Sequence, residues 1–287
     1  MNKNEKKEII DDVAETFEKD CKKEIGERLE ALYRVGSYAL HKISFERPDI
    51  NFLLVFKDKG TPDDFLRLAD ILRKLIEKYK DKVLIRPDFR PFKSIYPKFR
   101  RDYEITINTI IMNSAERNFP VPFNYPKYFL EAIKNSRQLV FGNDILEDVK
   151  IGKITRQHVQ EWMIRDILFC ELPLARSPVQ YDEDEYDLFF NEVFSIAKAL
   201  CTFGIEAAMS DKELAEKKYV DYIVNKEKMV NFYEKRYSKD SAQMVEKVLD
   251  AGENYLKYKN NKEEVKKIFR IALNLAELLK GRLFQGE

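Results

Sequence analysis

The chain has 287 residues whose charges almost cancel, with 51 Lys and Arg against 50 Asp and Glu. This balance excludes a protein that is basic over its whole surface and a strongly acidic tail protein. A hydrophobic content of 44% is enough for a core, whereas no apolar stretch approaches the roughly 20 residues of a membrane helix. The charged N-terminus predicts no export signal, and three isolated cysteines favour a reducing, cytoplasmic environment.

Helical and strand patterns alternate over the first half of the chain. Apolar residues at helical spacing predict a helix over 4–24, and apolar runs predict strands over 29–35 and 50–56. Thr61 followed by Pro62 is typical of a helix start, and the predicted helix continues to Tyr79. Two further strands are predicted, over 83–86 and 102–112. The alternation predicts an α/β or α+β domain over residues 1–145.

The second half carries helical patterns almost throughout, which predicts an all-α bundle over residues 146–287. We expect Pro173, Pro178 and the acidic run over 182–185 to separate the first two helices. The expected helices cover 159–170, 185–203, 211–222, 226–237, 241–258 and 263–284. Neither a Rossmann GxGxxG motif nor a P-loop occurs, which argues against those two nucleotide sites.

A short motif joins a glycine turn to polar residues on the next strand. Gly36, Ser37 and the small Ala39 follow the first predicted strand, and eleven residues separate Ser37 from Asp49. Asp49 and Asn51 lie two apart at the start of the second strand, so their side chains share one face.

A later predicted strand carries further polar residues at the same spacing. Asp102, Glu104 and Thr106 alternate with apolar or aromatic residues and therefore share one face of that strand. The two strands together offer several hard oxygen atoms, which are the ligands that Mg²⁺ prefers.

These motifs resemble the signature of the DNA polymerase β-like nucleotidyltransferase superfamily, in which Gly-Ser opens a helix and Asp-x-Asp begins the next strand. The resemblance implies a nucleotidyltransferase domain with a mixed sheet, similar to the minimal and aminoglycoside nucleotidyltransferases. It also implies transfer of a nucleoside monophosphate from a Mg²⁺- or Mn²⁺-bound nucleoside triphosphate to an acceptor hydroxyl. The acceptor class, whether a small molecule, a protein or an RNA, is left open.

The resemblance implies a role for each residue of the motif. Asp49 and Glu104 are the catalytic candidates, as metal ligands or base, and Asn51 is a weaker third metal ligand. Gly36 allows the triphosphate to approach the backbone, and the Ser37 hydroxyl and nearby amides hold phosphate oxygens.

The family has a carboxylate where this chain has Asn51. An amide oxygen can bind Mg²⁺, but it brings no charge. Two interpretations therefore stand side by side, an active transferase and a catalytically degenerate protein that binds nucleotide or nucleic acid. Asp102 is a candidate for a compensating ligand, although a surface charge at a strand edge is the simpler interpretation.

Two more segments resemble parts of such proteins. The run over 139–146 is similar to the segment that closes the transferase domain, with Phe141 and Asn143 as departures from the usual Tyr and Lys. The stretch over 197–215 resembles the C-terminal helical domains of aminoglycoside nucleotidyltransferases and the related HEPN bundles. The second half is therefore expected to bind the substrate or a partner.

Basic residues concentrate over 73–101, where eleven Lys and Arg face three acidic residues, a local charge of +8. Phe89, Phe92, Tyr96 and Phe99 lie among them. Cations interleaved with rings are typical of surfaces that bind single-stranded nucleic acid, and a solvated helix face followed by a loop is the other interpretation. The expected partners are thus a nucleoside triphosphate, an acceptor and a nucleic acid at this segment, with no membrane; a homodimer is left open.

Overall fold

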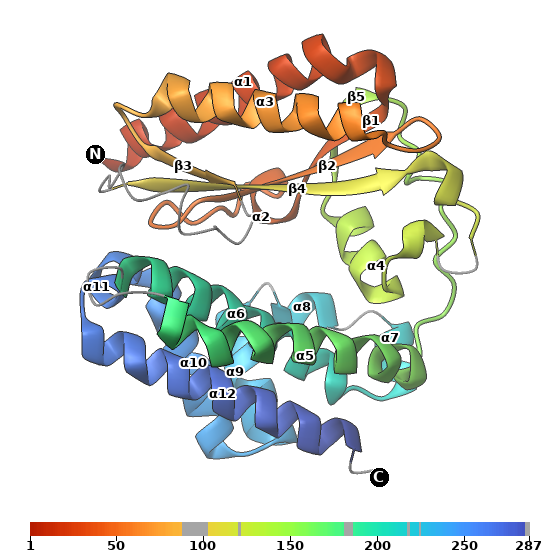
Figure 1. Ribbon diagram of the computed structural model, residues 1–287. Coiled ribbons are helices and arrows are strands. Elements are labelled where there is room, and N and C mark those ends of the chain that lie inside the picture. The colour runs from red at the N-terminus through yellow and green to blue at the C-terminus, as the bar shows by residue number, and fades with distance from the viewer. Residues whose placement is uncertain (88–102, 120–121, 181–185, 217–218, 224, 285–287) are drawn as a thin grey trace. The chain divides into compact units, whose positions relative to one another are not determined.

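The structure is a computed structural model that describes residues 1–87, 103–119, 122–180, 186–216, 219–223 and 225–284 (Figure 1). Its contacts divide the chain into two compact units, Met1–Ile151 and Gly152–Glu287. None of the described helices is long and apolar enough to cross a membrane.

Unit 1 is built on a mixed sheet of five strands in the order β3-β4-β2-β1-β5. The strands are β1 (Leu29–Val35), β2 (Asp49–Phe56), β3 (Leu84–Pro87), β4 (Glu104–Asn113) and β5 (Gln138–Gly142). β4 runs parallel to both β2 and β3, whereas β1 is antiparallel to β2 and β5. The fold class is the expected one, a mixed sheet with helices followed by a helical region.

Two helices, α1 (Lys3–Ile25) and α3 (Pro62–Tyr79), cover one face of this sheet (Figure 1). The core beneath them joins Phe17 of α1 and Leu75 of α3 to Phe52 on β2, all fully buried. The start of α3 follows from its sequence, because Thr61 accepts a hydrogen bond from the Asp64 amide while Asp64 bonds back to Thr61.

The opposite face is covered over part of its area by α4 (Lys127–Asn135), a helix that the sequence patterns did not predict (Figure 1). Leu130 and Ile133 of α4 pack with Tyr33, Leu53 and Met112 of the sheet. The connecting segments include α2 (Gly36–Ala39) and three short 3₁₀ turns at Gly26–Arg28, Ser114–Glu116 and Pro122–Asn124.

Unit 1 ends at Ile151, within the range of about 146–155 in which the sequence pattern changes. Leu146, Val149 and Ile151 are buried in the same cluster as α4, so these residues are part of the core beneath that face. They are neither helix nor strand, so the sequence pattern locates the boundary only approximately.

Unit 2 contains α-helices only among its described regular elements, in keeping with the expected all-α pattern. They are α5 (Arg156–Gln180), α6 (Tyr186–Ala207), α7 (Asp211–Ala215), α8 (Tyr219–Ile223), α9 (Lys226–Arg236), α10 (Lys239–Glu253), α11 (Tyr255–Lys259) and α12 (Lys262–Phe284). The long helices α5, α6 and α12 contact one another.

The expected interruption at Pro173 and Pro178 is wrong, because both prolines lie inside α5. A proline in a helix removes a backbone donor and crowds the preceding turn. Here the packing of α5 on α6 and α12, with Leu174 fully buried, offsets that cost. The helix expected over 211–222 is two short helices instead, and the one expected over 241–258 breaks at Asn254.

Candidate functional site

The glycine turn follows directly from the end of β1. Gly36 has φ +74°, a conformation that favours glycine, and the preceding Val35 pairs with Asn51 of β2. A Cβ atom built on Gly36 would lie 3.5 Å from the Asn51 amide nitrogen, so the turn and the second strand meet at this point. The structure thereby brings together two parts of the motif that are fifteen positions apart in the sequence.

The helix that begins at this turn is short. α2 spans four residues, so it offers little of the partial positive charge that a longer helix carries at its N-terminus. The Gly36 amide donates a hydrogen bond to Ser136 Oγ at 3.0 Å. Ser37 is exposed beside it and remains the group of this turn that is available to a ligand.

The polar residues of β2 lie opposite polar residues of β4. In the parallel register, Asp49 faces Thr106 and Asn51 faces Asn108. The Asn108 side-chain nitrogen donates to Asp49 Oδ1 at 2.7 Å and to Asn51 Oδ1 at 2.8 Å. One amide group therefore draws two oxygen atoms toward a single point.

Asn108 is the residue of this site that the sequence predictions missed. It lies on the predicted strand with the same parity as Glu104 and Thr106, so strand alternation alone could have indicated it. The family resemblance implies an acidic residue on that strand, and Glu104 meets this expectation, so the resemblance did not indicate Asn108.

Glu104 lies on the same face of β4 but has a different partner. Its Oε2 accepts a hydrogen bond from an Arg86 side-chain nitrogen at 2.9 Å. Arg86 faces Thr106 across the β3–β4 pair, which puts its side chain on the same face of the sheet. The ion pair is largely buried, with 4% of the Arg86 side chain and 13% of the Glu104 side chain exposed. Removal of either partner would break a largely buried ion pair, which is destabilising.

The sheet face therefore has two distinct parts. Tyr33, Leu53, Val55 and Met112 pack in the core beneath α4, whereas Asp49, Asn51 and Asn108 are half-buried. The change from half-buried polar to buried apolar side chains takes place along one strand, because Asn51 and Leu53 are two residues apart on β2. The polar part is the candidate functional site.

The described residues of unit 1 support one divalent ion better than two. Asp49 Oδ1 and Asn51 Oδ1 are hard oxygen ligands that already converge, and a positively polarised N–H group lies between them. Their formal charge is −1, and the Glu104 charge is matched by Arg86. No group of three or more His, Cys, Asp or Glu suited to a metal is found among the described residues.

The basic segment over 73–101 is only partly visible. Asp102 and residues 88–101 lie outside the described residues, and so do its four aromatic residues. On the described part, Arg73 pairs with Asp70, Lys80 pairs with Glu77, and Lys74 lies 3.6 Å from Glu24. These cations, on α3 and directly after it, form ordinary surface ion pairs, which contribute little to stability.

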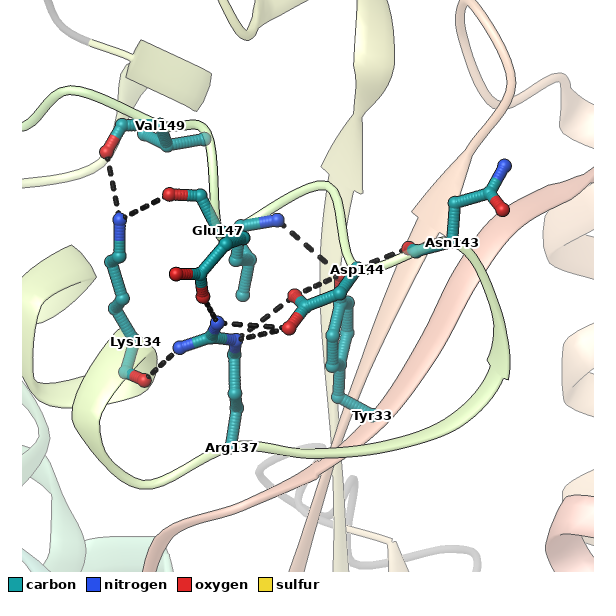
Figure 2. Close-up of polar contacts among 8 residues, drawn as sticks. Tyr33, Lys134, Arg137, Asn143, Asp144, Glu147 and Val149 are labelled. Carbon is teal, nitrogen blue, oxygen red and sulfur yellow. Dashed lines mark hydrogen bonds and ion pairs between the residues drawn. The ribbon is translucent and has the colours of Figure 1, made fainter.

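The run over 139–146 forms a different kind of polar cluster (Figure 2). Arg137 donates to both oxygens of Asp144, through Nε at 2.9 Å to Oδ1 and through a terminal nitrogen at 2.8 Å to Oδ2. The hydroxyl of Tyr33, which is fully buried, reaches the same carboxylate at 3.1 Å. These hydrogen bonds, above all those from Arg137, hold the pKa of Asp144 below its ordinary value of 3.8.

The same cluster ties α4 to the end of unit 1. Lys134 Nζ donates to the carbonyl oxygens of Glu147 at 2.7 Å and Val149 at 3.1 Å, and Arg137 also pairs with Glu147 (Figure 2). Every charged group drawn there has a partner within the cluster. Its arrangement fits a structural role.

No protein-family model and no curated protein sequence matches the chain. Among solved structures, the chain is similar to the crystal structure of a spectinomycin adenyltransferase from Enterococcus faecialis with ATP and spectinomycin. The identity is 15% and the TM-score is 0.48, and the likeness covers 91% of this chain and 98% of that chain.

Proposed function

We propose that unit 1 binds a nucleoside triphosphate with a divalent ion and transfers its nucleoside monophosphate to an acceptor hydroxyl. The observation that carries this proposal is the convergence of Asp49 Oδ1 and Asn51 Oδ1 on one point, beside the Gly36 turn. The order of the Gly-Ser turn and the Asp-x-Asn strand, which resembles the nucleotidyltransferase signature, supports the same function.

Asp49 and Asn51 would hold a Mg²⁺ or Mn²⁺ ion. When bound, this ion supplies positive charge that offsets the charge of the triphosphate. The absence of a side chain at Gly36 leaves room for phosphate oxygens, and the exposed Ser37 hydroxyl donates a hydrogen bond to one of them.

Glu104 would act as the base toward the acceptor. It accepts the proton of the acceptor hydroxyl, whose oxygen forms a bond to the α-phosphorus while the bond to the bridging oxygen breaks and pyrophosphate leaves. Arg86 is a positioning residue in this scheme, since it holds Glu104 Oε2 at 2.9 Å. Unit 2 would supply the binding surface for the acceptor or a partner, and its acidic run over 182–185 lies outside the described residues.

A second function, nucleotide binding without transfer, is favoured by a specific observation. Asn51 contributes no charge to the site, and Glu104 is paired with a buried arginine. A site with a formal charge of −1 binds a second divalent ion weakly, and two ions are the usual arrangement for this chemistry.

Labelled nucleotides separate the two functions. The chain is incubated with each α-labelled nucleoside triphosphate and Mg²⁺ or Mn²⁺, and label is followed into small-molecule, protein and RNA fractions. We expect Mn²⁺-dependent transfer that Asp49→Ala lowers by about 10²-fold or more, because the carboxylate is the charged ligand. The matched control is Asn113→Ala, which removes a polar residue at the far end of β4.

Calorimetry with the same nucleotides decides the remaining cases. If the chain binds nucleotide without transferring it, and Asn51→Asp does not produce transfer, the second function, binding alone, is established. If no nucleoside triphosphate binds in the presence of Mg²⁺ or Mn²⁺, both proposed functions are wrong.

A further inference from the structure

The side chain of Asn108 occupies the point on which Asp49 and Asn51 converge. Its amide nitrogen donates to two oxygen atoms and lies 2.7 Å from Asp49 Oδ1 and 2.8 Å from Asn51 Oδ1. Among the described residues, this is the one hydrogen bond that the Asp49 carboxylate accepts. The amide is the positively polarised group of the site.

An N–H group between two converging oxygens lies where a bound cation would lie. Without a positively polarised group there, the carboxylate and the amide oxygen would repel each other. Asn108 therefore keeps both oxygens aimed at one point in the absence of an ion. A divalent ion that binds at this point must displace the nitrogen, since two positive groups cannot share it.

The Asn108 side chain can move its nitrogen away from this point by rotation. Rotation of the amide about its Cβ–Cγ bond exchanges the nitrogen and the oxygen. The same group then presents an acceptor instead of a donor to the same point. Amide oxygens are accepted ligands of hard divalent cations.

Glu104 is less suited to be the third ligand. Its Oε2 is held by Arg86, and Thr106 separates it from Asn108 along the same face of β4. Movement of Glu104 toward an ion would break its largely buried ion pair with Arg86. Asn108 is already in contact with both other ligands.

We propose that Asp49, Asn51 and Asn108 form one divalent-cation site, in which the Asn108 amide turns from hydrogen-bond donor to oxygen ligand when the ion binds. The proposal rests on the proposed function and identifies its metal site. The three ligands carry a single negative charge, so the ion binds weakly by itself. A nucleoside triphosphate adds negative charge and oxygen ligands, and the ion and the nucleotide therefore bind cooperatively.

Direct titration with Mn²⁺, followed by the electron paramagnetic resonance of the free ion, tests the ligand set without an activity assay. Asn108→Ala removes a ligand, and we expect Mn²⁺ affinity about tenfold lower. Asn108→Asp replaces the amide by a carboxylate, and we expect affinity about tenfold higher, because affinity rises with ligand charge. A merely structural role of Asn108 would lower the affinity in both variants.

Two further variants serve as references in the same titration. Asn113→Ala is matched to Asn108→Ala in residue type and strand. It removes the hydrogen bonds that Asn113 accepts from the Gly60 amide at 2.9 Å and donates to Glu116 at 3.1 Å, at the other end of β4. Its Mn²⁺ affinity should equal that of the wild type. Glu104→Gln should also leave the affinity unchanged, and circular dichroism verifies that each variant is folded.

Nuclear magnetic resonance follows the amide itself. The side-chain NH₂ signal of Asn108, assigned by its loss in Asn108→Ala, should shift on addition of Mg²⁺, because its hydrogen bonds to Asp49 and Asn51 break. The shift should become larger when ATP is added with Mg²⁺.

The proposal is overturned if Asn108→Ala leaves Mn²⁺ affinity unchanged or raises it, if Asn108→Asp lowers it, or if Glu104→Gln lowers it as much as Asp49→Ala does. Its failure is distinguishable from that of the proposed function. Nucleotidyl transfer with no effect of Asn108 on Mn²⁺ binding would refute the metal site alone. The expected order of Mn²⁺ affinities without any nucleotide binding would refute the function alone.

Discussion

Two polar clusters of unit 1 are built around an aspartate, and they differ in how its charge is matched. Asp144 receives hydrogen bonds from Arg137 on both oxygens and a further one from Tyr33 (Figure 2). Asp49 accepts a single described hydrogen bond, from the neutral amide of Asn108. The first carboxylate is neutralised by its own chain, whereas the second is not neutralised by any described cation.

This difference separates a structural cluster from a candidate binding site. A carboxylate with a bidentate arginine gains little from a metal ion, because the ion would have to displace a well-placed cation. A carboxylate that shares one amide with a second oxygen atom can exchange that amide for an ion at low cost. Both clusters lie in segments that resemble the same family, so the resemblance alone did not distinguish them.

The largest expected effect concerns the backbone beside the structural cluster. Gly142 has φ +83°, and a Cβ atom there would lie 2.1 Å from the Glu30 carbonyl oxygen. Gly142→Val should therefore lower the free energy of unfolding by about 3 kcal/mol or more, measured by urea denaturation. Gly281→Ala is the control, since a Cβ there meets nothing within 4 Å; it should stabilise by about 0.5 kcal/mol. Equal effects of the two substitutions would contradict the prediction.

A buried carboxylate of unit 2 extends the comparison, because no described cation forms an ion pair with it. Glu206 of α6 is 4% exposed, and burial, with a smaller contribution from the charge of Asp166, raises its pKa from 4.5 to about 8. The folded protein retains this proton above pH 4.5 while the unfolded chain loses it. The contribution of this proton to the free energy of unfolding is therefore complete below pH 4.5 and is lost as the pH rises toward 8.

Glu206→Gln should remove this pH dependence. At pH 8 the variant should be more stable than the wild type by about 3 kcal/mol, and at pH 4.5 the two should be nearly equal. Trp162, the single tryptophan, lies in α5 and reports the unfolding of unit 2 by its fluorescence. A difference between the two proteins that does not change with pH would refute the prediction.

Removal of the charge at Asp144 should change the free energy of unfolding less than Glu206→Gln does, and with the opposite pH dependence. Asp144→Asn loses charged hydrogen bonds from Arg137, and we expect a loss of about 1 kcal/mol at pH 7, because 35% of the Asp144 side chain is exposed. The folded-state pKa is lowered, so the stabilisation is present above about pH 4 and is lost as the pH falls below the ordinary value of 3.8. Urea denaturation at pH 7 and pH 3 measures the change.

The smallest effect on stability is expected at the candidate site. Asp49→Asn retains an oxygen that can accept the Asn108 hydrogen bond, so the free energy of unfolding should change by about 0.5 kcal/mol or less. Mn²⁺ affinity should nevertheless fall, because the single uncompensated charge is gone. The comparison between the clusters fails if Asp49→Asn destabilises the chain as much as Asp144→Asn does.

Much of the fold could be predicted from local pattern. The strand over 29–35 has the predicted bounds, and the helix predicted from Thr61 to Tyr79 begins at Pro62 and ends at Tyr79. These elements carry strong local features, such as a capping box and an unbroken apolar spacing. α4 was missed because its nine residues follow an irregular stretch and begin after Pro126, without a side-chain cap.

The continuation of α5 through Pro173 and Pro178 could not be predicted from propensity. A proline is unfavourable inside an isolated helix. The packing of α5 on α6 and α12, which local sequence does not show, makes the continuous helix favourable. The bounds of unit 1 depended likewise on the burial of Leu146, Val149 and Ile151, which have no periodic pattern.

For the candidate site, the sequence by itself determined which residues alternate onto one strand face and where a glycine turn precedes them, because side-chain parity and positive φ are local properties. Together with the family resemblance, these patterns select Gly36, Ser37, Asp49, Asn51 and Glu104 as candidates, and their roles stay predictions. Only the tertiary structure decided their partners, since the register of β2 on β4 places Asn108 opposite Asn51, and that of β3 on β4 places Arg86 near Glu104. Strand register depends on contacts between residues far apart in the chain. It determines that Asp49 and Asn51 share a neutral amide, whereas Glu104 is paired with a cation.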